Sequence, residues 1–393
     1  MAHFTLQLPA PATEMVQEEI SKQAVFLSKD IARVAFEDAR TLGFDAPGDS
    51  GPELLPKVRE LAERIQRGLR RLERKVLFRS SAMESPRFQG GPVAPGFRLL
   101  GPGQVSLAGV YLRLFRYFDR IFEQMGEPFG AKPIMVPTLI PTRVLAACDY
   151  FRSFPQYVTF ACHLPEEVER VSGFRARHEQ AEDLDDQALA DMQKPEACLS
   201  PAVCYHIYHL KRDQVVPAAG SAYGMCGRCF RYESGNLSDL RRLWDFTMRE
   251  IVLLGGREYV LEQRERSISL MSKLIEEHQL AGEIRTASDP FFLAPDTVSK
   301  TYFQLSSDTK FEISLLLPDG ERLAVGSHNY HSDFFGKVFN VGIDGGGPMH
   351  SVCVAFGLER WVHAFLAQHG HAPAEWPACV RQAPEFLGAE SSW

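Results

Sequence analysis

The sequence has no hydrophobic run long enough to cross a membrane. Its apolar stretches, such as residues 351–358, are strand-sized and fall short of the about 18 residues that a spanning helix needs. The N-terminus lacks the basic start and the apolar segment of a secretory signal. We therefore expect a cytoplasmic protein that does not bind membranes.

Positive charge and cysteine are also scarce. The 43 Lys and Arg residues are outnumbered by 50 Asp and Glu residues, which gives a formal net charge of −7 and excludes a basic nucleic-acid footprint over the whole molecule. Eight cysteines at irregular spacing in 393 residues do not predict a disulfide framework. Four of them are interpreted as small core or surface residues: Cys148, Cys162, Cys198 and Cys379.

The common short fingerprints of catalysis are missing. The chain has no GxxxxGK phosphate loop, no GxGxxG dinucleotide motif, no HExxH and no GxSxG. A phosphate-binding site must therefore use side chains. The length of 393 residues and the 45% hydrophobic content are typical of a globular protein of about two or three domains.

The first 80 residues show helical periodicity. Apolar residues at steps of three and four predict one helix over residues 14–42 and a second over residues 58–76, which together form an N-terminal helical hairpin (1–80). The second helix carries a basic face that is either a solvated surface or a dock for an acidic partner. Its residues are Lys57, Arg59, Arg64, Arg67, Arg70, Arg71, Arg74, Lys75 and Arg79.

The rest of the chain divides into three parts. Residues 81–103 are rich in Gly, Pro and Ser and predict a linker, residues 104–371 form one large mixed domain, and residues 372–393 predict a loosely ordered C-terminal tail. Within the large domain we expect a helix in 104–126, a strand near 134–142 and a charged helical insertion in 165–198. Further strands are expected at 226–233, 311–317, 322–327 and 349–356, and helices or long strands at 240–254 and 257–280.

The segment CGRCFRYESGN (226–236), followed by LRRLWDFTMRE (240–250), suits a nucleotide. As a hairpin it presents Arg231, Glu233, Phe246 and Glu250 to one concave surface. Arginine grips phosphate through two hydrogen bonds, an aromatic ring stacks on a purine, and a carboxylate accepts from an amine. The alternative interpretation is a hairpin that carries ordinary surface charges.

A second candidate lies in VAFGLERWVHAF, where a strand turns directly into an apolar helix. Arg360 then lies at the helix N-terminus, where the helix dipole and the guanidinium both favour an anion.

Together these segments resemble motifs 2 and 3 of class II aminoacyl-tRNA synthetases, and KPIMVPTLIP, with Pro137, is compatible with motif 1. More narrowly, CYH, WDFTMRE and HNYHSDFFGKVF resemble the amino acid:[carrier protein] ligases, which are similar to the catalytic core of the archaeal, zinc-dependent seryl-tRNA synthetase. The resemblance covers roughly residues 100–370. It implies an α+β fold, with an antiparallel sheet flanked by helices, and a homodimer.

The resemblance implies a catalytic Zn²⁺ held by Cys204, Glu250 and Cys353. Two thiolates and a carboxylate leave a fourth tetrahedral position open for substrate. A competing interpretation is that the CxxC pair, residues 226 and 229, is half of a structural zinc site or a redox pair.

Two histidine pairs are weaker metal candidates. His206 with His209, and His328 with His331, are three residues apart, and on strands that spacing directs the two side chains to opposite faces. They are therefore interpreted as structural or substrate-contacting residues.

The resemblance also implies roles in ATP binding. Arg231 would hold the α-phosphate, Arg360 the terminal phosphate, Phe246 the adenine face and Glu233 the adenine amine, with Mg²⁺ bridging the phosphates. The acidic Mg²⁺ ligand usual on the strand before motif 3 is missing, which leaves Glu312 or Glu321 as alternatives.

The remaining expectations concern substrate and acceptor. Ser327 and Asn329 are candidate pocket residues for a small amino acid, which is glycine, alanine or serine. The predicted acceptor is the phosphopantetheine thiol of a carrier protein, because the net charge is negative and the N-terminal part is small for a tRNA-binding domain. The carrier would dock on residues 257–280 or on the basic helix 57–79. The alternatives are a seryl-type tRNA synthetase with a shortened tRNA arm and a catalytically idle binding module.

Overall fold

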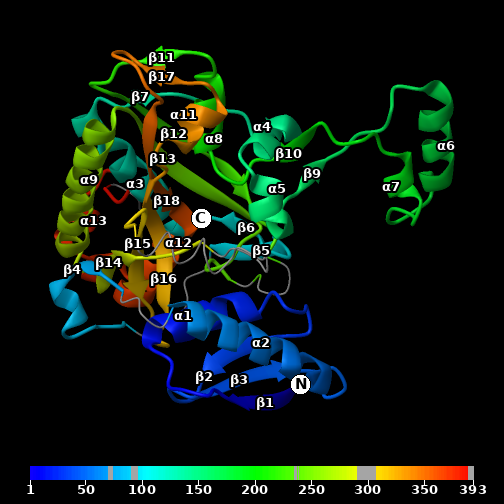
Figure 1. Cartoon of the computed structure of the whole chain (residues 1–393), viewed down its shortest axis with the longest axis horizontal. Helices are drawn as coiled ribbons and strands as arrows, with labels where there is room; N and C mark the ends of the chain where they lie inside the picture. Colours follow the sequence, from blue (N-terminus) through cyan, green and yellow to red (C-terminus); the bar gives the residue numbers. More distant parts are fainter. Residues whose placement is uncertain (70–73, 90–95, 234–236, 238, 290–306, 388–393) are drawn as a thin grey trace.

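The computed structural model describes residues 1–69, 74–89, 96–233, 237, 239–289 and 307–387. Its body is an eight-stranded sheet in the order β4-β14-β15-β16-β18-β13-β12-β7, with helices on both sides (Figure 1). Every neighbouring pair is antiparallel except β7 and β12. The predicted α+β class with an antiparallel sheet flanked by helices is confirmed. The strands are β4 (Val76–Arg79), β7 (Lys132–Pro133), β12 (Ser221–Phe230), β13 (Asp245–Gly255), β14 (Gly282–Thr286), β15 (Lys310–Leu316), β16 (Arg322–Tyr330) and β18 (His350–Gly357).

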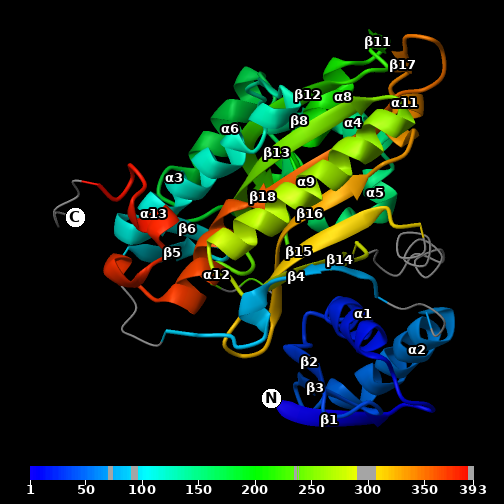
Figure 2. The same ribbon diagram turned by 90° about the vertical axis from the view of Figure 1, so that its left-hand side faces the viewer.

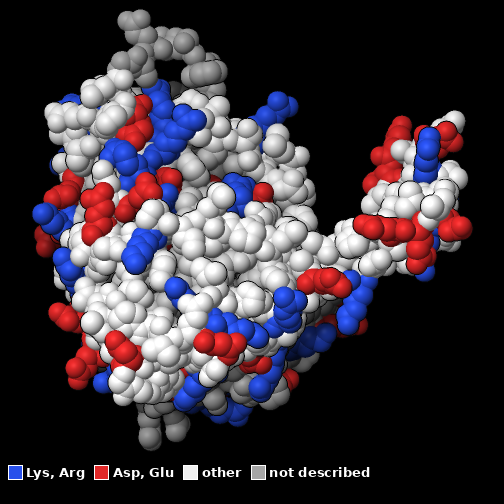
Figure 3. Space-filling view, turned by 90° about the horizontal axis from the view of Figure 1, so that it is seen from above, with Lys and Arg blue, Asp and Glu red and all other residues white. Residues whose placement is uncertain are grey.

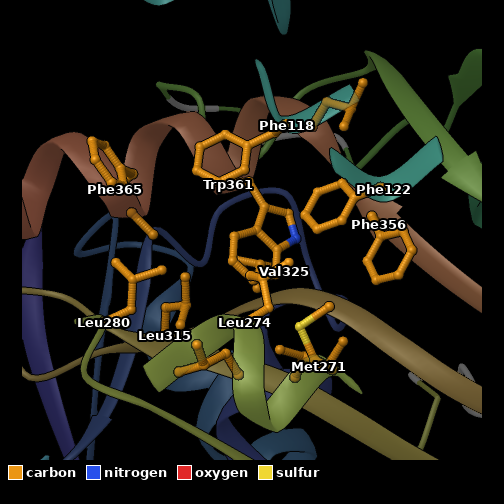
Figure 4. Packing of buried hydrophobic residues seen from close by; sticks show 14 of the residues in the cluster. Phe118, Phe122, Met271, Leu274, Leu280, Leu315, Val325, Phe356, Trp361 and Phe365 are labelled. Carbon is orange, nitrogen blue, oxygen red and sulfur yellow. The ribbon is translucent and has the colours of Figure 1, made fainter. Parts of the chain in front are cut away.

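One face of this sheet, called the back face below, packs against three long helices (Figure 2). They are α3 (Gly109–Gln124), α9 (Arg257–Glu277) and α12 (Leu358–His369). The indole of Trp361 is fully buried there, with ring centroids 5.0 Å from Phe122 and 5.5 Å from Phe118 (Figure 4). Residues 240–254 and 257–280, left open between helix and strand, are largely strand β13 and helix α9.

The opposite face, called the front face, carries a second core built with shorter helices. These are α4 (Thr142–Ala147), α5 (Tyr150–Ser153), α8 (Cys204–Leu210) and α11 (Phe334–Val338). The connecting elements of this side are β8 (Leu139–Pro141), η3 (Pro155–Tyr157), β11 (Val215–Val216) and β17 (Gly342–Ile343). The short helix η2 (Glu127–Phe129) follows α3, and its Phe129 packs against the back-face core. Among the described helices, none combines the length and the apolar character needed to cross a bilayer.

The predicted N-terminal helical hairpin is wrong. Residues 1–69 form an α+β module with the sheet order β1-β3-β2 and two helices. The first helix ends at Ala24, because the apolar residues that follow belong to a turn and to strands, and Val34 lies in a strand. The Asp38 carboxylate closes the hairpin between those strands by accepting from the backbone N–H groups of Arg40 at 2.6 Å and Thr41 at 2.8 Å. The elements are β1 (Ala2–Gln7), α1 (Glu14–Ala24), β2 (Arg33–Phe36), β3 (Thr41–Ala46) and α2 (Gly51–Leu69).

The region between this module and the large domain is more ordered than a linker. Strand β4, inside the predicted N-terminal part, pairs with β14 at the edge of the main sheet. Within the predicted linker, η1 (Ser81–Met83) is a short helix, and β5 (Phe97–Gly101) forms a hairpin with β6 (Gln104–Leu107). Residues 70–73, with Arg70 and Arg71, and residues 90–95 lie outside the described part of the chain.

The charged insertion is helical, as expected, and stands away from the body as an arm (Figures 1 and 3). It consists of α6 (Val168–His178) and α7 (Ala188–Asp191), and its base is formed by β9 (Phe160–Ala161) and β10 (Ala197–Leu199). Figure 3 shows acidic side chains over much of its surface.

The expectation of a loose C-terminal tail is wrong for residues 372–387. They include η5 (Pro373–Glu375) and α13 (Ala378–Arg381). Trp376 and Val380 are buried in the back-face core, and Glu385 accepts two hydrogen bonds from Arg120, at 2.7 and 2.8 Å. Large apolar side chains thus tie down a segment whose composition resembles a tail. Residues 388–393 lie outside the described chain.

Candidate metal and nucleotide site

The strand register brings those predicted site residues that lie on β13, β15, β16 and β18 to the front face. Glu250 of β13 lies opposite Ala355 of β18, Ala355 opposite Ser327 of β16, and Ser327 opposite Glu312 of β15. Residues directly opposite one another in antiparallel strands project from the same face. Four strands therefore present one row of side chains that spans the face.

A second row lies two residues further along the same strands. Cys353 is opposite Asn329, which is opposite Lys310. Since side chains two residues apart share a face, Cys353 and Asn329 join Glu250 and Ser327 on the front. The sheet thus collects residues that are up to about a hundred positions apart in the sequence.

Cys204, Glu250 and Cys353 converge as predicted. Cys204 is the first residue of α8, which packs on the front face, and the candidate ligand atoms of the three residues all lie within 4.8 Å of one another. The Cys353 Sγ donates to Glu250 Oε2 at 2.9 Å, and the backbone N–H of Val203 donates to Glu250 Oε1 at 3.3 Å. The three residues are 8%, 0% and 2% exposed, in chain order.

The electrostatics of this cluster suit a cation. Burial raises the pKa of the Glu250 carboxyl, and burial with a hydrogen bond to Cys204 raises the pKa of the Cys353 thiol well above its usual range. Three acidic groups in one buried space repel one another when they ionise, and a divalent cation bound there would offset that charge. The donor set of two sulfurs and one carboxylate matches zinc, and three protein ligands leave a coordination position for substrate.

The CxxC pair does not form a competing centre. Cys226 and Cys229 are three residues apart on β12, so they project to opposite faces; Cys226 packs against the back-face core and Cys229 belongs to the front-face core. Among the described residues, only Cys204, Glu250 and Cys353 form a potential metal-binding group of three or more.

The histidine pairs separate into different environments. His206 and His209 lie on helix α8, so the argument from strand spacing does not apply to that pair. His328 projects to the back face, where its Nδ1 is 2.9 Å from Ser267 Oγ. His331 follows β16 near the front-face core, and burial lowers its pKa to about 4, so its ring is neutral at pH 7.

On the nucleotide side, Arg231 and Phe246 lie together. Arg231 directly follows β12, its Nε donates to the carbonyl of Pro201 at 3.0 Å, and its guanidinium carbon is 5.5 Å from the centroid of the Phe246 ring. Glu233 forms an ion pair with Arg242 at 2.6 Å. Residues 234–236, with the Asn236 that closes the predicted motif, lie outside the described chain.

Arg360 lies in the first turn of α12, as the sequence predicted. Its Nε donates to the carbonyl of Arg241 at 2.7 Å and its Nη1 to the carbonyl of Ala324 at 2.9 Å. Two backbone acceptors therefore fix the direction of the guanidinium before any ligand arrives.

The two candidate Mg²⁺ ligands differ in position. Glu312 is on the front face, opposite Ser327, whose Oγ accepts from Asn329 Nδ2 at 2.9 Å. Glu321 lies in the turn before β16 and pairs with Arg241 at 3.1 Å. Desolvation would raise the pKa of Glu312, but the basic side chains around it hold that pKa below its usual value. These are Lys310, Lys22, Arg285 and Arg74.

Several residues at this site carried no signal that sequence reasoning used. Tyr208 Oη is 3.3 Å from His331 Nδ1, and Ser351 Oγ is 3.2 Å from the same nitrogen. An ion pair between Lys310 and Asp289 lies beside Glu312. Tyr208 could have been found from its spacing, since it follows Cys204 by four residues on one helix.

No family model matches the chain. An amino acid–[acyl-carrier-protein] ligase of Bradyrhizobium diazoefficiens is 32% identical over 287 residues, which cover 71% of this chain and 82% of that protein. A type-2 serine–tRNA ligase of Methanopyrus kandleri is 28% identical over 273 residues, 66% of this chain; the match spans only 52%, about half, of that relative's length.

The fold also has a solved counterpart. The crystal structure of M. kandleri SerRS in complex with A. aeolicus tRNASec superposes with a TM-score of 0.71 at 23% identity and covers 97% of this chain and 76% of that one. This likeness establishes the class II aminoacyl-tRNA synthetase fold. With 32% identity to a protein that it covers over 82% of its length, the chain belongs to the amino acid–[acyl-carrier-protein] ligase family.

Proposed function

We propose that this protein activates a small amino acid with ATP and transfers it to the phosphopantetheine thiol of a carrier protein. The observation that carries the proposal is the convergence of Cys204, Glu250 and Cys353 on the face that also holds Phe246 and Glu312. An amine-binding metal centre and a nucleotide site on one surface are what formation of an aminoacyl adenylate requires.

In the first step a carboxylate oxygen of the amino acid attacks the α-phosphorus of ATP, and pyrophosphate leaves. The carboxylate is already ionised at pH 7, so the residues supply alignment and charge neutralisation instead of a base. Arg231 faces the α-phosphate, Arg360 the terminal phosphate and Phe246 the adenine, while Glu233 accepts from the adenine amine. The guanidinium groups of Arg231 and Arg360 stabilise the negative charge that develops on the phosphates.

Residues of this chain are available to hold two metal ions. Zinc, held by Cys204, Glu250 and Cys353, would supply a Lewis acid that binds the neutral amino group of the substrate. Glu312, with Ser327 beside it, would hold Mg²⁺ at the phosphates. Glu321 is disfavoured as the Mg²⁺ ligand, because it lies in the turn before β16 and forms an ion pair with Arg241. Asn329 and Ser327 line the pocket for a glycine, alanine or serine side chain.

In the second step the thiol sulfur attacks the acyl carbon of the adenylate. A thioester forms, AMP leaves and the thiol proton is released. The proposed dock for the carrier is the exposed basic side of α2, with Lys57, Arg59 and Arg67. Helix α9 packs on the back face, away from the cluster, which disfavours residues 257–280. Arg74 and Lys75, counted in the predicted basic face, instead pair with Glu18 and Asp308.

We also propose a homodimer through the motif 1 segment at β7. This strand is the edge of the main sheet, and Met135 just beyond it is 92% exposed. Analytical ultracentrifugation of wild type and Met135→Lys tests the interface: a wild-type monomer contradicts it, and a dimer that dissociates in the variant supports it.

A seryl-type tRNA ligase is the second candidate function. The fold likeness to SerRS covers 97% of this chain and thus includes the N-terminal module, whereas the match to the carrier-protein ligase covers 71%. Charging of purified tRNA without transfer to a pantetheinylated carrier protein would favour this candidate. A catalytically idle module is the third alternative, and it predicts no adenylate formation at all.

The decisive experiment is ATP–pyrophosphate exchange with glycine, alanine and serine, with and without a zinc chelator. Exchange that needs both an amino acid and the metal supports the proposal. Absence of exchange with all three amino acids contradicts it, and exchange that survives the chelator removes the zinc role. As matched variants, Cys204→Ser should abolish exchange and Cys226→Ser should not, since only the first sulfur belongs to the cluster.

A further inference from the structure

Helix α1 of the N-terminal module is seated on the catalytic domain along a single stripe. Glu14, Glu18, Lys22 and Phe26 follow at steps of four, so they lie on one side of the helix and its C-terminal extension. Glu14 pairs with Arg322 at 2.8 Å, and Glu18 pairs with Arg74 at 2.6 Å and with Arg285 at 3.1 Å. Figure 2 shows α1 on the side of the module that meets the large domain.

This stripe meets the catalytic face of the sheet. Arg285 of β14 lies opposite Glu312 of β15, in the row that also holds Ser327 and Glu250. Because opposite residues share a face, the side chain that Glu18 binds projects from the same side as the metal cluster. The N-terminal module is therefore built against the front of the sheet.

Near Glu312, α1 holds the segment that follows β14. Lys22 Nζ donates to the carbonyl of Ser288, and Glu19 accepts from the Ser288 hydroxyl at 2.7 Å. Ser288 is 4% and Glu19 3% exposed, so these hydrogen bonds are shielded from water. The next residue, Asp289, pairs with Lys310, two positions from Glu312 on the same strand.

Near Arg231, the residue Phe26 beyond the end of α1 contacts Tyr157 of η3. The rings of Phe26 and Tyr157 meet edge to face, with centroids 6.1 Å apart and an interplanar angle of 76°. Tyr157 is 5% exposed, and its carbonyl accepts from the backbone N–H of Tyr232 at 3.3 Å. Tyr232 directly follows Arg231, the proposed ligand of the α-phosphate. Phe26 is therefore connected to Arg231 through Tyr157 and Tyr232.

Helix α1, together with Phe26 two residues beyond its end, thus contacts segments on both sides of the proposed nucleotide site. We propose that α1 and the turn that follows it are a positioning element of the nucleotide site, which sets the separation between Arg231 and Glu312 through Phe26 on the Arg231 side and Lys22 on the Glu312 side. The inference rests on the proposed function, because that function assigns Arg231 and Glu312 to MgATP. Lys22 and Phe26 are positioning residues and need not touch the nucleotide.

The test is the affinity of the full-length protein for a non-hydrolysable ATP analogue with Mg²⁺, measured by titration calorimetry. Lys22→Met and Phe26→Ala should each weaken binding about tenfold, because misplacement by an ångström at a reacting site is costly. Lys22→Arg should restore most of the affinity. Lys29→Met removes a lysine that is exposed on the same module, and it should leave affinity unchanged.

A kinetic split and a double variant separate positioning from folding. In ATP–pyrophosphate exchange, the KM for ATP should rise in both single variants while the KM for the amino acid stays within about twofold. The double variant should lose less than the product of the two single losses, since both residues act on one separation. Ser288→Ala, which deletes only a hydroxyl, provides a mild variant if the others unfold.

The outcomes are distinguishable. Folded Lys22 and Phe26 variants, or a folded Ser288 variant, that bind the analogue as tightly as wild type overturn the inference and leave the proposed function intact. Equal rises in both KM values also overturn it, because they indicate general loosening. A wild-type protein that binds no ATP analogue overturns the proposed function and this inference with it.

Discussion

Neighbouring residues of the same strands have opposite roles on the two faces of the central sheet. In β16, Asn329 projects to the front, in register with Cys353, while His328 is fully buried at the back against Ser267 of α9. In β13, Glu250 belongs to the cluster with Cys204 and Cys353, whereas Ile251 belongs to the core around Trp361. Adjacent residues of one strand thus belong either to the candidate site on the front face or to the core on the back face. A substitution at one of them therefore tests one face separately from the other.

The largest expected effect is the loss of metal binding and activity when one of two buried glutamates is changed. Glu250→Gln should remove bound zinc and reduce ATP–pyrophosphate exchange by at least about a hundredfold, because the amide is a poor zinc ligand. Glu359→Gln is the control: Glu359 is 3% exposed and accepts from Thr247 N–H at 2.9 Å, outside the cluster. Metal analysis and exchange assays on both proteins provide the measurement, and equal zinc loss in the two variants would refute the division between the faces.

The next effect is on stability. Trp361→Ala empties the centre of the back-face core and should lower the free energy of unfolding by about 3–5 kcal/mol. Zinc content per folded molecule should not change, since no ligand lies on that face. Denaturant unfolding and metal analysis check the two statements, and a variant that loses zinc while still folded would show that the faces are coupled.

The smallest effect distinguishes Asn329 from His328. Asn329→Ala should raise the KM for the amino acid about tenfold with little change in melting temperature, because a lost polar contact to substrate is worth about 1–2 kcal/mol. His328→Leu should leave that KM unchanged. A KM shift in the His328 variant, without one in the Asn329 variant, would reverse the assignment of faces.

His328 also predicts a pH dependence. Burial lowers its pKa from 6.5 to about 3, so the folded protein keeps the ring neutral while the unfolded chain takes up a proton as the pH falls below 6.5. Unfolding then becomes easier toward acid pH, by about 1 kcal/mol per pH unit for this group. Between about pH 6.5 and 5.5, the free energy of unfolding should fall less steeply with pH in His328→Leu than in wild type. An equal slope in the two proteins would contradict a buried, neutral His328.

Prediction from sequence succeeded where a local motif coincides with a local structure. The strand expected at 226–233, which in the structure ends at Phe230, the turn into α12 at Arg360 and the helical insertion all follow from short patterns. Prediction failed for the N-terminal module, because apolar residues continue to recur at steps of three and four beyond Ala24, where the helix ends. Val34, which fits that spacing, belongs to strand β2. It failed again at Trp376, whose burial depends on a core built by distant helices.

The sequence by itself determined which chemistry is available: two sulfurs, a carboxylate and two arginines in segments that resemble known motifs. Tertiary structure alone decided that Cys204 meets Glu250 and Cys353, that Glu312 and not Glu321 lies on their face, and that α1 packs against that face. The physical reason is that strand register and helix docking are set by non-local packing. No periodicity within a short window records which distant strand lies opposite.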